Sequence, residues 1–142
     1  MNLIWGIITL IFSLFCWGGQ AISLFWPIAA AKMGLTELEA DVDPAYFADL
    51  RAEALWDTVS TWVLVVAAIL MIINNAVWPY FGLIGGGIYL YFAGRGIAAR
   101  MLYQRRGISI GKASSVKQAY VALSLWGMVA VGMIVLSILE LS

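Results

Sequence analysis

The chain has 142 residues, of which 63% are hydrophobic and 11% charged, and its eight Lys and Arg residues balance its eight Asp and Glu residues. Because soluble domains are about half apolar and about a quarter charged, this composition and a mean hydropathy of +0.94 exclude an ordinary soluble domain and predict an integral membrane protein. A net charge of zero gives no electrostatic reason to bind nucleic acid, and the absence of histidine excludes haem b and histidine-ligated metals, so we expect no cofactor.

The charged residues divide the chain into spans and loops. Three long tracts contain no charged residue: 1–31, 58–94 and 118–139. A transmembrane helix needs about 20 apolar residues, so the outer tracts each hold one span and the middle tract holds two short ones. We therefore predict a single all-α domain, a four-transmembrane-helix bundle with helices at about 3–30, 56–73, 77–95 and 116–139. The alternative is a three-span fold in which one very long tilted helix covers the middle tract.

Small and weakly polar residues recur on one face of the first predicted helix. They follow Gly6 at intervals of three and four residues, and they are Thr9, Ser13, Cys16, Gln20 and Ser23. In lipid such residues let helices approach closely, so we predict a helix-packing face. The alternative is the wall of a polar pore or ligand cavity, with Gln20 as its most polar member. Because an unpaired amide is costly in hydrocarbon, Gln20 is expected to have a hydrogen-bond partner in either case.

Residues 31–55 are predicted to form an acidic cytoplasmic loop whose second half is already helical. Asp43 followed by Pro44 is typical of a helix N-cap and first turn, so the second helix should begin near residue 44 in water. Three carboxylates then follow on one helix face: Asp49, Glu53 and Asp57. We predict a solvated acidic face that pairs with the basic loop opposite, and we keep the three as weak candidates for a metal site.

The third predicted helix is rich in glycine. Asn74 and Asn75, followed by Pro79, predict the turn that precedes it. Gly82 and Gly86 then form a GxxxG pattern, and glycine inside a helix costs about 1 kcal/mol relative to alanine. Another helix packed closely against this backbone would explain them, in the same chain or in a partner. We therefore treat the two glycines as a candidate oligomer contact.

Residues 96–115 are predicted to form a basic cytoplasmic loop. The third helix extends past the membrane to Arg106, with Gly107 as its C-cap, and Ser115 to Gln118 form a capping-box pattern that opens the fourth helix. The candidates in or next to this loop for binding anionic lipid head groups are Arg100, Arg105, Arg106, Lys112 and Lys117. The alternative is that they are ordinary anchors of a membrane protein.

The four-span arrangement also fixes an orientation. It places all eight basic residues on one side of the membrane, and the positive-inside rule makes that side cytoplasmic. Both termini then lie outside, and we expect the protein in a bacterial inner membrane. No ionised side chain is predicted inside the hydrocarbon, which argues against a proton-coupled transporter.

Two helices also carry residues found together in a known family. The second predicted helix contains Pro44, Tyr46, Arg51 and Ala52, and the third contains Tyr89, Arg95 and Tyr103. With four spans, this layout resembles the family of membrane-associated proteins in eicosanoid and glutathione metabolism. Leu55 and Thr58 stand where that family has Asn and Glu. The resemblance implies a membrane-embedded enzyme or binding protein, a homotrimer that holds glutathione through Arg51 and Arg95.

Three functions remain compatible with these features. The short loops hold no extramembrane catalytic domain, so we expect a structural or accessory subunit of a membrane complex, or a homo-oligomer, with other membrane chains as partners. The second possibility is the glutathione-binding protein or enzyme implied by the resemblance. The third is a passive channel or lipid-binding module lined by the polar seam of the first helix.

Overall fold

The computed structural model describes residues 2–142, and the regular secondary structure of that part of the chain is all helical, without strands. The elements follow in the order α1 (Asn2–Phe25), α2 (Pro27–Lys32), the 3₁₀-helix η1 (Glu39–Asp41), α3 (Pro44–Ser60), α4 (Trp62–Ile72), α5 (Trp78–Arg105) and α6 (Ala113–Leu141). α3 leads into α4 through Thr61, whose N–H still bonds to the Asp57 carbonyl at 2.9 Å. The two therefore form one nearly continuous rod.

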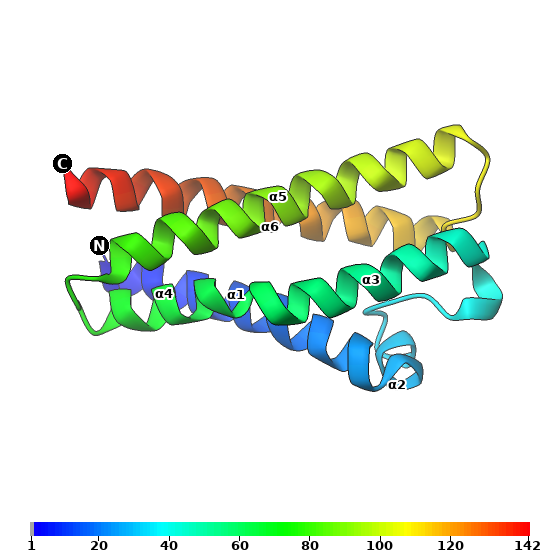
Figure 1. Ribbon diagram of the computed structural model, residues 1–142, viewed down its shortest axis with the longest axis horizontal. Coiled ribbons are helices and arrows are strands. Elements are labelled where there is room, and N and C mark those ends of the chain that lie inside the picture. The colour runs from blue at the N-terminus through cyan, green and yellow to red at the C-terminus, as the bar shows by residue number, and fades with distance from the viewer. Residues whose placement is uncertain (1) are drawn as a thin grey trace.

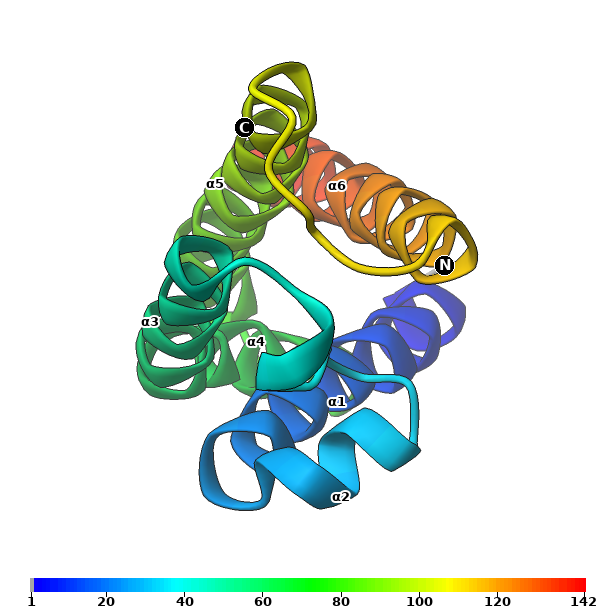
Figure 2. The same cartoon turned by 90° about the vertical axis from the view of Figure 1, so that its right-hand side faces the viewer.

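The long helices run side by side along the length of the molecule, with both termini at one end (Figure 1). Seen from the opposite end, α1, α4, α5 and α6 surround the core in that order (Figure 2). α5 packs extensively on α4 and α6, and α1 packs on α3 and α4, whereas α1 and α6 make few contacts. The bundle is therefore closed on three sides and loosely joined on the fourth.

Within residues 2–142, three helices are long and apolar enough to cross a membrane: Asn2–Phe25, Pro44–Ile72 and Ala113–Leu141. These lengths and compositions support the prediction of a membrane protein. α5 has 28 residues but is less apolar, because glycine, tyrosine and arginine interrupt its hydrophobic residues.

The first helix ends earlier than its predicted limit, at Phe25 rather than near residue 30. Pro27 has no N–H to donate to the Ser23 carbonyl, so the helix breaks at Trp26 and Pro27 begins the separate helix α2. The guanidinium of Arg51 on α3 supplies donors for the last carbonyls of α1: it donates to the carbonyl of Ser23 and, at 2.9 Å, to that of Leu24. Arg51 thus caps the carboxyl end of α1.

Two predicted helix boundaries of the middle region are confirmed. Asp43 is the N-cap of α3, and its Oδ1 accepts a hydrogen bond from Ala45 N at 2.8 Å. The predicted turn before α5 contains Asn74 at φ 52°, followed by Asn75, whose Oδ1 accepts from Val77 N at 3.1 Å. Both loops use short side chains that can satisfy nearby backbone groups.

The predicted basic loop is mostly helix. α5 continues to Arg105 and is terminated by Gly107 at φ 70°, so its predicted extension and C-cap are confirmed. α6 begins at Ala113, with Lys112 at the N-cap and no side-chain hydrogen bond to the cap. The capping box predicted at Ser115 is therefore wrong, because the helix has already started there.

Glycine determines how closely α5 packs inside the bundle. A Cβ added at Gly82 would lie 2.2 Å from Ser137 Oγ, and one at Gly86 would lie 3.1 Å from the carbonyl oxygen of Ala130, both on α6. A Cβ at Gly85 would lie 2.8 Å from Cα of Leu64 on α4. The GxxxG pattern therefore serves packing within this chain, and its assignment to an oligomer contact is wrong.

Candidate ligand cavity

The seam on α1 divides into two parts. Thr9 and Ser13 are fully buried, and a Cβ at Gly6 would lie 3.4 Å from the Ala68 carbonyl oxygen, so this part packs on α4 as predicted. Cys16, Gln20 and Ser23 instead line a cavity of about 190 Å³. The first part of the seam therefore packs against another helix, and the second part lines a cavity.

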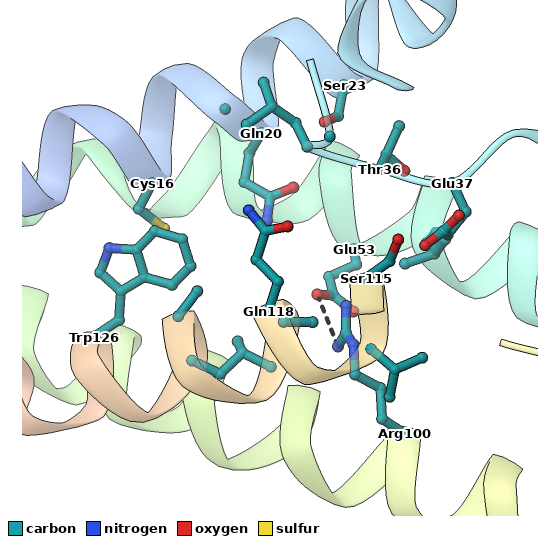
Figure 3. Close-up of a pocket in the computed structure, with 18 of the residues that line it drawn as sticks. Cys16, Gln20, Ser23, Thr36, Glu37, Glu53, Arg100, Ser115, Gln118 and Trp126 are labelled. Atoms are coloured by element: carbon teal, nitrogen blue, oxygen red, sulfur yellow. Dashed lines mark ion pairs between the residues drawn. The ribbon is translucent and has the colours of Figure 1, made fainter. Parts of the chain in front are cut away.

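The cavity lies at the end of the bundle opposite the termini, which we call the charged end. This end carries every Lys and Arg residue and every acidic residue except Glu140. The cavity walls come from α1, α3, α5, α6 and the loop that precedes η1 (Figure 3). Its polar lining therefore combines side chains from segments that are distant in the sequence.

Arg100 on α5 is the buried cation of this cavity, and it is only 9% exposed. Its Nη1 donates to the Gly96 carbonyl at 3.0 Å and lies 3.8 Å from Oε1 of Glu53. Its Cζ lies 6.0 Å from the ring centroid of Tyr46. The buried Nε has no hydrogen-bond partner within residues 2–142. Since a guanidinium has five N–H donors and an unsatisfied buried donor is costly, Arg100 has bonding capacity left for a ligand.

Glu53 on α3 is the buried anion beside it, with a side chain that is 8% exposed. Its Oε2 accepts a hydrogen bond from Arg95 Nη1 at 2.9 Å, and the other amino group of Arg95 pairs with Asp49. The predicted pairing of the acidic helix face with the basic side is confirmed at these residues.

The prediction that this acidic face is solvated is wrong at two of its three positions. The Glu53 side chain and Asp57, which is 7% exposed, point into the bundle. Asp57 Oδ2 also lacks a hydrogen-bond partner in the described chain. Both carboxyl groups belong to the helical rod Pro44–Ile72, so ionisable groups do enter a segment long enough to span. Across residues 2–142, no three His, Cys, Asp or Glu residues are grouped as a metal site would require.

Two amides project into the cavity from opposite walls. Gln20 comes from α1 and Gln118 from α6, and their side chains point toward each other (Figure 3). The hydrogen-bond partner expected for the Gln20 amide is not found among residues 2–142. Sequence reasoning named Gln20 but missed Gln118, Glu37 and Ser115, which line the same cavity.

An apolar groove of about 310 Å³ continues the cavity between α1 and α6. Its walls are Ile11, Phe12, Phe15, Ala122, Leu125 and Trp126. Three of these residues, Phe15, Ala122 and Trp126, also line the polar cavity, so the two spaces adjoin. Trp126 Nε1 donates to the Phe12 carbonyl at 3.0 Å, which joins the two helices across the groove.

The other arginine candidates lie elsewhere. Arg51 caps α1 and Arg95 is held by two carboxylates, so neither lines the cavity. Arg105 and Arg106 are exposed at the end of α5. Of the five arginines considered from the sequence, the cavity contains Arg100.

Comparison with known proteins adds no relative. No protein-family model, curated protein or solved structure matches this chain. The resemblance to the eicosanoid and glutathione family gains no support from the internal contacts of Arg51 and Arg95.

Proposed function

We propose that this chain is a four-span membrane protein that binds one amphiphilic lipid between α1 and α6. The polar head would occupy the cavity at the charged end, and an acyl chain would lie in the apolar groove. The observation that carries the proposal is the continuity of the two spaces: the cavity that contains a buried guanidinium with an unused donor adjoins a groove lined by apolar side chains. This combination fits a molecule with one polar and one apolar end.

The depth of each space supports this proposal. With a rise of about 1.5 Å per residue, Gln20 lies roughly 27 Å along α1 from Asn2, and Ile11 lies roughly 14 Å along it. The hydrocarbon core of a bilayer is about 30 Å thick. With Asn2 at the outer boundary of this core, the cavity would lie near the inner boundary, next to the lipid head groups, and the groove would lie at the level of the acyl chains.

In this proposal α5 is the fourth span. Its 28 residues correspond to roughly 42 Å of helix, enough to cross the bilayer beside α4 and α6. Its lower hydropathy is compatible with its place in the bundle, because four of its six glycines face neighbouring helices: Gly82, Gly85, Gly86 and Gly96. The charged end would face the cytoplasm and both termini the outside, in keeping with the positive-inside rule.

The accessory-subunit role loses its candidate contact with a partner, because Gly82 and Gly86 are covered by α6 of the same chain. It stays a prediction without a supporting surface. The lipid-binding role, in contrast, has a defined site with a polar and an apolar part.

The substitution Ala122→Trp tests the proposal, because Ala122 lines both the cavity and the groove. We expect the indole to fill the junction, so that the purified variant retains far less lipid by native mass spectrometry than the unaltered protein. Val121→Trp is the matched control, since Val121 is 54% exposed on the same helix and lines neither space. Equal lipid retention by the two variants would contradict the proposal.

A further inference from the structure

We infer that the head group bound in the cavity is zwitterionic, with an anionic group held by Arg100 and a primary ammonium held by Glu37 and Glu53. This inference rests on the proposed function and specifies its ligand. One arginine and two glutamates line the same cavity of about 190 Å³.

The anionic half of the ligand is assigned by Arg100. Its Nε is buried without a partner, and its Nη1 lies 3.8 Å from Glu53, too far for a hydrogen bond. A phosphate can accept two parallel N–H bonds from a guanidinium, which is the geometry that an arginine with unused donors favours. Arg100 is therefore the binding group for the phosphate.

The cationic half is assigned by the carboxylates. Glu53 uses Oε2 for Arg95, while Oε1 remains beyond hydrogen-bond distance of Arg100. Glu37 approaches from the loop before η1 and is held against Gly111, where an added Cβ would lie 2.6 Å from its carboxylate. Gly111 has a φ of +108°, which favours glycine and so preserves this close approach. Both carboxylates can accept hydrogen bonds from an ammonium group.

A head group of a single charge sign fits this cavity less well. A purely anionic one would bring its charge near two carboxylates, and a purely cationic one would bring its charge near Arg100. A primary ammonium supplies three N–H donors, which a quaternary ammonium lacks. The cavity should therefore prefer phosphoethanolamine over phosphocholine and phosphoglycerol head groups, while Gln20 and Gln118 face the uncharged part of the ligand.

The test is a native mass spectrometry titration of the full-length protein in mild detergent. The probes are phosphatidylethanolamine, phosphatidylcholine and phosphatidylglycerol with identical acyl chains. We expect phosphatidylethanolamine to bind most tightly. Glu37→Gln should lower its affinity about tenfold and leave that of phosphatidylglycerol unchanged or higher, because a charge-assisted hydrogen bond is lost. Arg100→Gln should weaken all three.

Glu39→Gln is the matched control, because Glu39 is exposed in the neighbouring 3₁₀-helix and does not line the cavity. It should leave all three affinities unchanged. If phosphatidylglycerol binds most tightly, or if all three bind equally while Ala122→Trp still abolishes binding, the head-group inference is wrong and the lipid site stands. If Ala122→Trp leaves the binding of all three unchanged, the proposed function itself fails.

Discussion

The two interfaces of α6 differ in how closely they bring helices together. Toward α5, Gly82 and Gly86 leave no room for a side chain. Toward α1, a Cβ at Gly132 would lie 2.3 Å from the Trp5 ring near the termini, and Trp126 Nε1 donates to the Phe12 carbonyl beside the groove. Nearer the charged end, aromatic rings and facing amides occupy the space between α1 and α6. Glycine lets α5 and α6 pack closely, whereas the larger residues between α1 and α6 leave a space that a ligand can occupy.

The largest expected effect is at the other closely packed interface of α5, where Gly85 faces α4. In Gly85→Leu the new side chain would start 2.8 Å from Leu64 Cα and 2.9 Å from Leu64 N, which are backbone atoms and cannot rotate away. We expect a destabilisation of about 3 kcal/mol or more from overpacking. Unfolding in sodium dodecyl sulfate, followed by circular dichroism, measures it.

Gly87→Leu is the control for that experiment. A Cβ at Gly87 meets no atom within 4 Å, so leucine there should be neutral or should stabilise the helix by up to about 1 kcal/mol. Similar destabilisation by both substitutions would show that α5 does not pack on α4 through Gly85.

We expect a smaller loss of stability from substitutions in the α1 seam, and a different loss in its packed part than in its cavity part. Ser13 is fully buried and its carbonyl accepts a hydrogen bond from the Tyr89 hydroxyl at 3.2 Å, so Ser13→Leu should destabilise the protein by roughly 1–3 kcal/mol. Gln20 faces the cavity, so Gln20→Leu should change the free energy of unfolding by less than about 1 kcal/mol. The same substitution should weaken lipid binding. The same unfolding assay separates them. A larger loss for Gln20→Leu than for Ser13→Leu would contradict this division of the seam.

Local signals in the sequence were sufficient for several features of the fold. Asp43 with Pro44, the Asn74–Asn75 turn and Gly107 each act through neighbouring backbone, so their effects could be predicted from short segments. Pro27 is also a local signal for the end of the first helix. The prediction missed it because residues 3–30 are uncharged and mostly apolar and therefore look like one span. Proline removes a hydrogen bond without making the segment less hydrophobic.

The cavity could be predicted only in part, because it depends on which helices become neighbours. Gln20 was identifiable as a polar group within an apolar span, and a search for a second such amide would have found Gln118 at the start of the last uncharged tract. Glu37 gives no local signal, since it reaches the cavity through a loop contact with Gly111. Burial of Glu53 likewise follows from the packing of α3 on α1 and α5 rather than from its helix face.

Photo-crosslinking tests the lipid site most directly. A benzophenone amino acid would replace Leu125 in the groove or, as a control, Val135, which is 48% exposed on α6 outside it. After exchange into lipid-free detergent and irradiation, mass spectrometry should detect a phospholipid adduct at position 125 and none at position 135. Absence of an adduct at position 125, or equal labelling at both positions, would contradict a lipid held between α1 and α6.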